Sequence, residues 1–236
     1  MKKYCILAIL SILLAQANAS TIGVNSIGVN LGSFEFGVDA SVNGTNADIS
    51  KSGFAYEISG NFNLISPKEE KSFGVDAGIR YLGSNGISLG DVDIDITMID
   101  GGVRPYLSLS GVTLFADAGF SYIKIEGTET STGLSRSESE TSFAPGVGAQ
   151  INFEKLNVRP TLHWVTYGDD QFDSELDLND FVRLTIPVSY NFSDKIDISF
   201  KYGHTFGTSF SYTDGANSMS VEPYMNEYLI GLDYKF

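Results

Sequence analysis

The sequence has 236 residues, of which 42% are hydrophobic, and a mean hydropathy of +0.01. This composition argues against wholesale disorder, and its 25 Gly, 16 Phe and 12 Tyr favour strands and turns. Acidic residues outnumber basic residues 29 to 15, giving a net charge of −14. This disfavours nucleic-acid binding, which relies on Lys and Arg against phosphate. Cys5 is the sole cysteine, so the chain beyond it has no disulfide, cysteine-ligated metal or cysteine nucleophile.

The first 19 residues have the pattern of a secretory signal peptide. Lys2 and Lys3 precede an apolar run from about Ile6 to Ala15, and small residues end the segment at Ala19. The apolar run is too short to span a bilayer comfortably, which argues against an N-terminal membrane helix. We therefore expect a signal peptide over residues 1–19 and a single domain over residues 20–236.

After this segment, ten stretches of the chain alternate apolar and polar residues with a period of two, which is typical of β-strands. In the last stretch, Tyr228, Ile230 and Leu232 share one face, opposite Glu227 and Asp233. The ten stretches cover residues 34–42, 54–64, 73–82, 97–109, 113–124, 143–153, 158–167, 182–192, 196–206 and 224–236.

The connections between these stretches alternate between short and long. The short ones are 66–71, 110–112, 154–156 and 193–195, and the long polar ones are 43–53, 83–96, 126–141, 168–179 and 207–222. A soluble β-sandwich would alternate along each strand, but it would not explain this strict order. Short turns on one rim and long loops on the other are typical of periplasmic turns and extracellular loops in outer-membrane barrels.

Sixteen aromatic residues lie near the ends of these stretches, on the apolar face. One group is next to the short turns: Phe34, Phe62, Phe73, Phe153, Phe192, Tyr234 and Phe236. The other is next to the long loops: Phe54, Tyr56, Tyr81, Tyr122, Phe143, Trp164, Tyr202, Phe206 and Tyr224. Amphipathic rings favour the headgroup level of a bilayer, so two such belts indicate a membrane between them.

The chain ends in Tyr-Leu-Ile-Gly-Leu-Asp-Tyr-Lys-Phe, with a terminal aromatic residue and apolar residues at alternate positions before it. This ending resembles the C-terminal assembly signal of Gram-negative outer-membrane β-barrels. The matching positions are Tyr228, Ile230, Leu232, Tyr234 and Phe236. The whole chain is similar to small single-domain barrels of the OmpA-like or porin-like group. The resemblance implies an outer-membrane location and delivery to the barrel-assembly machinery.

We therefore predict an all-β, transmembrane, antiparallel up-and-down β-barrel of about ten strands. Two features leave eight or twelve strands open. Pro105, Pro145, Pro160 and Pro187 fall inside predicted strands, where bulges would accommodate them. The stretch 21–32 changes its alternation twice, so it either extends the first strand or lies in the periplasm or the lumen.

The predicted register points a set of charged residues into the lumen. They are Glu35, Asp39, Glu57, Asp76, Asp100, Asp117, Asp197, Glu227 and Asp233, with Arg80, Arg104, Arg159, Arg183, Lys201 and Lys235. Buried charges need partners, and a barrel of this size can be filled by its side chains, so we expect an internal ion-pair network. The alternative is a small water-filled pore with a slight cation preference.

Enzymatic activity is not expected, because no nucleophile and base are recognisably placed. His163 points inward near Asp169 and Asp170, but the Asp-x-His element of ten-stranded outer-membrane proteases is absent. His204 points toward lipid, without the serine spacing that outer-membrane lipid hydrolases use.

The long loops are acidic, and the stretch from Asp169 to Asp177 holds five acids and no base. Solvation explains such loops, and weak divalent-cation binding at Asp169, Asp170 and Asp173 is the sharper hypothesis. No spacing reproduces an EF-hand loop.

Two function classes follow from these features. One is a small porin-like passive channel or structural barrel, and the other is a surface-interaction or adhesion protein that uses acidic extracellular loops around a filled lumen. We expect a monomer without a cofactor, with outer-membrane lipid, lipopolysaccharide and the assembly machinery as partners.

Overall fold

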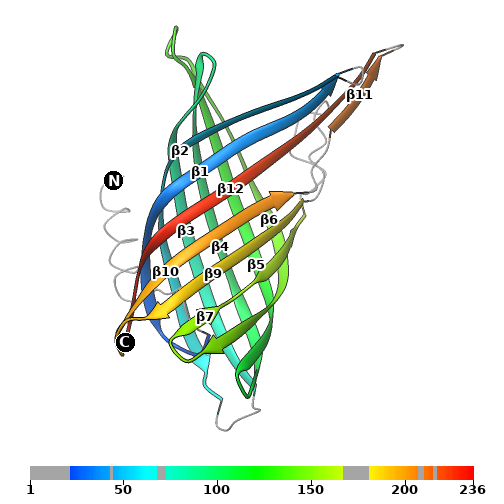
Figure 1. Ribbon diagram of the computed structural model, residues 1–236. Helices are drawn as coiled ribbons and strands as arrows, with labels where there is room; N and C mark the ends of the chain where they lie inside the picture. The colour runs from blue at the N-terminus through cyan, green and yellow to red at the C-terminus, as the bar shows by residue number, and fades with distance from the viewer. Residues whose placement is uncertain (1–21, 43–44, 68–72, 167–180, 207–209, 215–216) are drawn as a thin grey trace.

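The computed structural model describes residues 22–42, 45–67, 73–166, 181–206, 210–214 and 217–236. Its strands are β1 (Ser26–Val42), β2 (Thr45–Ile65), β3 (Phe73–Leu89), β4 (Val92–Leu109), β5 (Val112–Glu129), β6 (Ser135–Phe153), β7 (Leu156–Val158), β8 (Thr161–Val165), β9 (Phe181–Asn191), β10 (Ile196–Phe206), β11 (Phe210–Asp214) and β12 (Asn217–Lys235). Neighbouring strands pair antiparallel in the order β1-β2-β3-β4-β5-β6-β7-β9-β10-β12, with β8 also between β6 and β9, and β1 pairs with β12, which closes the sheet into a barrel (Figure 1).

The barrel wall has ten strands, as predicted. The strands β7 and β8 form one wall strand, because both keep the same register against β6, from Ile151↔Val158 to Gly148↔Thr161. The short β11 pairs only with the far end of β12, outside the wall. Both the start of β1 and the C-terminus lie at the end of the barrel with the short turns, which we call the short-turn end (Figure 1).

The prolines do not introduce bulges, which corrects the sequence-based expectation. Pairing is in constant register on both sides of Pro105 and Pro145, and Pro160 separates β7 from β8 without a shift. A missing proline N–H removes one ladder hydrogen bond locally, and the long neighbouring ladders hold the register. The register shifts of the β2–β3 and β3–β4 ladders lie elsewhere, between Asn63 and Ile65 and between Ser84 and Ile87.

Most of the predicted long loops are β-hairpins that continue the wall. Range 43–53 contains the start of β2, range 83–96 the β3–β4 turn, range 126–141 the ends of β5 and β6, and range 207–222 contains β11 and the start of β12. Outside a bilayer both faces of a strand are polar, so the apolar alternation ends while the backbone pairing continues. Range 168–179 lies outside the described residues. We call this end of the barrel the hairpin end.

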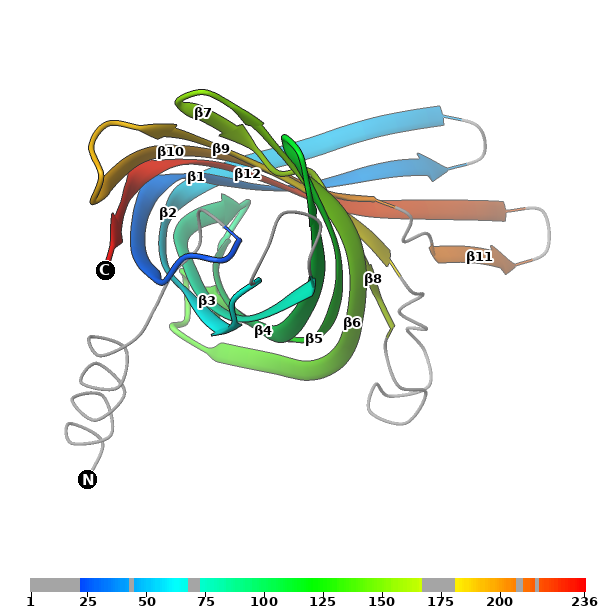
Figure 2. The same ribbon diagram turned by 90° about the horizontal axis from the view of Figure 1, so that it is seen from below.

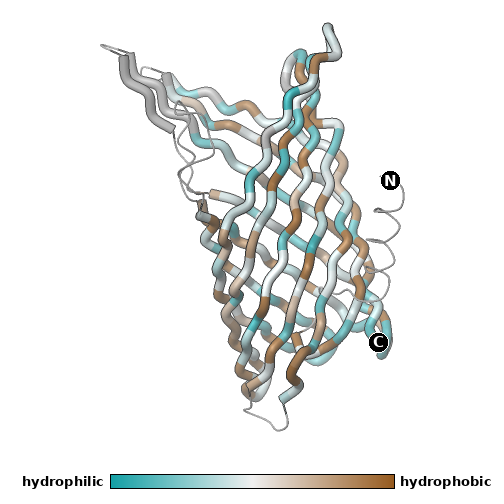
Figure 3. The backbone as a smooth tube through the Cα atoms, turned by 180° about the vertical axis from the view of Figure 1, so that it is seen from behind, coloured by the Kyte–Doolittle hydropathy of each residue, from teal (hydrophilic) through white to brown (hydrophobic). Residues whose placement is uncertain are grey.

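Exposed apolar side chains cover the outside of the barrel. They include Val29, Leu31, Ile79, Val103, Leu114, Phe120, Val147, Trp164, Ile198, Phe200, Ile230 and Leu232, each at least 37% exposed. Figure 3 shows hydrophobic and hydrophilic residues alternating along the strands between the two ends. This outward apolar surface is a lipid-facing surface.

No helix among the described residues is long and apolar enough to cross a membrane.

The strand β1 has the opposite facing to the one predicted. Val29 and Leu31 are exposed on the outside, while Phe34 is fully buried inside the barrel. Outward residues of β1 are therefore odd-numbered, and Phe34 is not part of an aromatic belt. The physical reason is that the lumen near the hairpin end is apolar. The inward face of β1 therefore carries apolar residues there, as a lipid-facing one would.

Candidate functional site

The lumen is the candidate site, and its layer nearest the hairpin end is an apolar cluster. Fully or almost fully buried side chains from five strands meet there: Phe34, Ala55, Leu82, Ile87, Ile96, Met98 and Leu229. Phe36, Ile94, Ile123 and Met225 pack against them. These side chains fill the lumen with contacts of the kind found in a protein core.

The middle of the lumen contains a network of ion pairs centred on Arg80. The Arg80 guanidinium donates from Nε to Glu57 Oε2 at 2.6 Å, from Nη1 to Asp100 Oδ2 at 3.0 Å, and from Nη2 to Glu227. Lys201 Nζ lies 2.6 Å from the same Glu57 oxygen. Each side chain comes from a different strand, so the network joins β2, β3, β4, β10 and β12 across the barrel.

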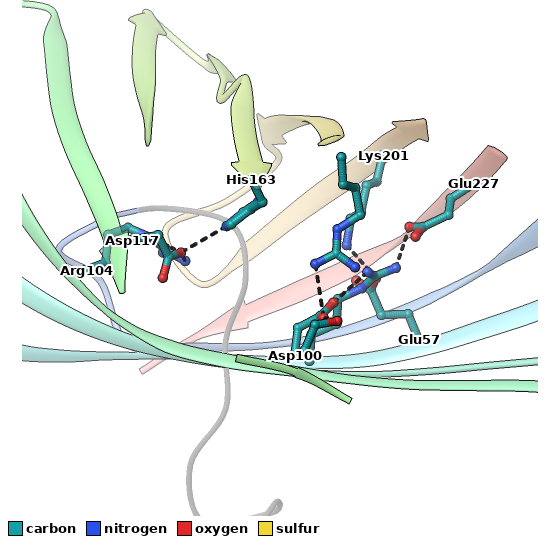
Figure 4. Close-up of polar contacts among 10 residues, drawn as sticks. Glu57, Asp100, Arg104, Asp117, His163, Lys201 and Glu227 are labelled. Carbon is teal, nitrogen blue, oxygen red and sulfur yellow. Dashed lines mark hydrogen bonds and ion pairs between the residues drawn. The ribbon is translucent and has the colours of Figure 1, made fainter. Parts of the chain in front are cut away.

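A second charged group faces this network across the lumen (Figure 4). Arg104 Nη2 and His163 Nε2 approach Asp117 Oδ2 at 3.1 and 3.5 Å. The guanidinium of Arg104 also stacks over Phe115, 5.3 Å from the ring centroid. Buried charges of this kind are stable only with partners, and each of these groups has one.

The layer nearest the short-turn end is closed by the start of the described chain. Figure 2 shows this segment, in blue, turning across the barrel opening. The N–H of Ile22 donates to Gln150 Oε1 at 3.0 Å, and the N–H of Gly23 donates to Asp76 Oδ2 at 2.8 Å. Ile22 packs in a buried cluster with Tyr106 and Phe115. Two of the options for stretch 21–32 therefore apply. Residues 22–25 lie in the lumen, and the residues from Ser26 onward extend the first strand.

A cavity of about 120 Å³ remains between these layers. Its lining includes Arg80, Arg104, Arg159, Arg183 and Lys201, together with Asp100 and Asp117. A second space of about 30 Å³ adjoins Glu57, Lys201 and Asp233. Between the apolar cluster and the closing segment, the described side chains therefore leave a small chamber lined by charged groups in the middle of the lumen.

Most of the charged residues predicted for the lumen lie there. The structure places the following side chains inside the barrel: Glu57, Asp76, Arg80, Asp100, Arg104, Asp117, Arg159, Arg183, Asp197, Lys201, Glu227, Asp233 and Lys235. Lys235 pairs with Asp197 at 2.7 Å near the short-turn end.

Glu35 and Asp39 are the exceptions, because β1 faces the other way. Glu35 lies on the outside and accepts a hydrogen bond from Asn226 Nδ2 at 2.9 Å. Asn226 Oδ1 in turn lies 2.6 Å from Nδ1 of His204. Asp39 is exposed beyond the lipid-facing surface, directly opposite Asp48 of β2 and Glu222 of β12.

Neutral polar residues complete the network, and no sequence pattern marks them as members of it. Asn30 Nδ2 donates to Glu57 Oε1 at 3.0 Å, and Ser199 Oγ donates to Asn30 Oδ1 at 2.8 Å. Asn61 Nδ2 donates to Asp76 Oδ2 and to the carbonyl oxygen of Val24. Their positions on the inward face could have been predicted from alternation, but their partners on other strands could not.

The five residues of the C-terminal pattern point outward on β12. Tyr228, Ile230, Leu232, Tyr234 and Phe236 are between 44% and 62% exposed, whereas the intervening Leu229 and Asp233 are buried. The candidate metal ligands Asp169, Asp170 and Asp173 lie outside the described residues. Within the described ranges, no group of three or more acidic, histidine or cysteine side chains could hold a metal ion.

Comparisons with known proteins agree with this architecture. A family model described as "Outer membrane protein beta-barrel domain" matches residues 5–164, more than half of the chain. No curated protein matches the sequence.

Three solved structures that the chain resembles are outer-membrane proteins or their domains. Ail, the attachment invasion locus protein of Yersinia pestis, has 13% identity, covering 89% of this chain and 98% of that one, with a TM-score of 0.35. Neisserial surface protein A has 13% identity, 89% and 97% coverage and a TM-score of 0.39. The β domain of the Bordetella autotransporter BrkA has 10% identity, 89% and 99% coverage and a TM-score of 0.42.

Proposed function

Because the chain belongs to the outer membrane protein β-barrel family and its lumen is filled at three levels, we propose that it is a closed barrel that presents extended hairpins for surface contacts. The filled lumen is the observation that carries this proposal. A passive pore would require the apolar cluster, the Arg80 network and the segment from Ile22 to separate together. Breaking a buried ion pair alone costs about 3–5 kcal/mol.

The hairpin end supplies the surface for such contacts. The ladder between β2 and β3 ends at Phe54↔Asn85, although both strands continue beyond it. Beyond this point the wall divides into two sheets, one formed by β11, β12, β1 and β2 and the other by β3, β4, β5 and β6 (Figure 1). Two separate sheets outside the bilayer offer faces and edges to which a partner can bind.

The first of these sheets is acidic. Asp48, Asp39 and Glu222 occupy one register row across β2, β1 and β12, and all three are exposed. Like charges directly opposite each other on a sheet are destabilising, so this row lowers the stability of the bare sheet. A partner with basic groups would relieve the repulsion, so we propose that the contact surface binds basic partners.

Neutralising acidic residues at each end of the barrel tests where such binding takes place. The protein, embedded in neutral lipid nanodiscs, is passed over immobilised poly-lysine, and Asp39→Asn combined with Asp48→Asn is expected to weaken retention. The matched control is Glu154→Gln combined with Asp194→Asn, which removes two exposed acids at the short-turn end. Equal retention of the two double variants would contradict a contact surface at the hairpin end.

A further inference from the structure

The cavity in the middle of the lumen results from a row of residues with little or no side chain. Gly78, Gly102, Gly119 and Ala144 are directly opposite one another on β3, β4, β5 and β6. All four lie at inward positions and line the cavity. At other levels of the lumen, large inward side chains occupy the corresponding space. The small residues at this level of the four strands therefore leave room for the chamber.

Hydrogen-bond donors on the opposite wall lack acceptors among the described residues. Arg183 of β9 lines the cavity, and its side chain is 5% exposed. Its Nη2 pairs with Asp100 Oδ1 at 3.0 Å, but Nε and Nη1 are buried without a hydrogen-bond partner in the described part of the chain. An unsatisfied buried charged donor is costly, so the chamber needs an acceptor.

The charge of the lining indicates what kind of acceptor fits. Five cationic side chains and two carboxylates line the cavity. Both carboxylates are already engaged, Asp100 with Arg80 and Arg183, and Asp117 with Arg104 and His163. The hydroxyl-bearing Thr161 and Thr185 add polar groups to the same wall.

We propose that this chamber is a binding site for one small oxyanion, of the size of sulfate or inorganic phosphate. Arg183 donates to it from Nε and Nη1, and the row of small residues on β3 to β6 provides the space. A cavity of about 120 Å³ has room for such an anion, because roughly 10–15 Å³ on this measure already holds one water molecule. The site is independent of the proposed surface contacts, because it lies inside the lumen and not at the hairpin end.

Equilibrium dialysis with radiolabelled sulfate and phosphate tests the site in the refolded protein in a non-ionic detergent. The wild type is expected to bind about one equivalent. Arg183→Lys keeps a positive charge opposite Asp100 and removes the donors Nε and Nη1, so it is expected to bind at least about tenfold more weakly. Gly78→Ala places a methyl group in the chamber at ordinary contact distance, 3.4 Å from Arg104 Nη2 and 3.5 Å from the carbonyl oxygen of Gly60, and is also expected to weaken binding.

The matched control is Lys124→Met, which removes a partly exposed cation outside the chamber and is expected to bind like the wild type. If Arg183→Lys does not refold, as judged by heat-modifiable migration, Gly78→Ala decides the question. Absence of bound label in the wild type above empty micelles would overturn the proposal, because the donors would then hold water. Unchanged binding in the folded variants would overturn it as well.

Discussion

Arg80 and Glu57 form the central contact of the lumen, with Arg80 Nε 2.6 Å from Glu57 Oε2 and the Glu57 side chain 1% exposed. Neighbouring strands β3 and β2 carry them, and their pairing places the guanidinium within reach of Asp100 and Glu227 as well. One cation therefore neutralises carboxylates from three other strands. The charged layer is consequently a structural crosslink of the barrel.

Replacing Arg80 by Met should destabilise the barrel by about 3–5 kcal/mol, because Glu57, Asp100 and Glu227 would lose a shared buried partner. Reversible urea unfolding in lipid vesicles, followed by tryptophan fluorescence, measures the change.

The control for this prediction is Lys124→Met, which breaks an ion pair with Glu126 whose two side chains are each 39% exposed. An exposed pair contributes about 1 kcal/mol or less, so this variant should unfold close to the wild type. If the two variants were equally stable, the lumen charges would not crosslink the barrel.

The facing of β1 can be tested by cysteine labelling, since Cys5 is the only native cysteine. A cysteine at Leu31 should react with a lipid-soluble maleimide in vesicles, and a cysteine at Asn30 should not, because Leu31 is 50% exposed and Asn30 is 3% exposed. The experiment uses a Cys5→Ser background. Labelling at Asn30 with protection at Leu31 would reverse the assigned facing.

Much of the fold could be predicted from alternation alone. A period of two places Arg80, Asp117 and Glu227 on inward faces because the apolar residues next to them on their strands are mainly on the lipid side. The same argument fails for β1, whose inward face ends in Phe34 within an apolar layer of the lumen. Where both faces of a strand are apolar, periodicity does not distinguish inside from outside.

The arrangement within the lumen could not be predicted, because it depends on strand stagger and on contacts between distant residues. Arg80 and Glu227 are 147 positions apart in the chain. Residues 22–25 close the short-turn end through hydrogen bonds to Asp76, Asn61 and Gln150, none of which a local pattern marks. Likewise, the hairpins at the hairpin end are polar on both faces, so no apolar alternation indicates how long their strands are.

Gly83→Ala should destabilise the barrel by about 1–3 kcal/mol, because a Cβ at this position would lie 2.4 Å from the ring of Tyr56 on the neighbouring strand. Tyr56→Ala replaces the ring by a methyl group. In the double variant, Gly83→Ala should therefore lower the free energy of unfolding much less than it does alone. Gly127→Ala serves as the control, since its Cβ would meet only Val92 Cγ1, at 3.4 Å. Strictly additive effects of the two changes in urea unfolding would rule out the clash.

The outward residues of β12 are expected to direct assembly of the barrel. Phe236→Ser should leave refolding of the purified protein into detergent nearly unchanged, because Phe236 is 57% exposed and adds little to the lumen. In Gram-negative cells the same variant should reach the outer membrane in lower amount, measured as the heat-modifiable form in membrane fractions. Phe153→Ser, which removes a similarly exposed aromatic residue at the end of β6, provides the matched control. Equal assembly of Phe236→Ser and the wild type would remove the assembly role.

Single-channel recording in a planar bilayer tests the closed lumen most directly. The wild-type protein, shown to be folded by heat-modifiable migration, should give no stable conductance steps, since an apolar layer, a charged layer and residues 22–25 fill its lumen. Stable, reproducible openings of the folded wild-type protein would contradict the account and show a passive pore.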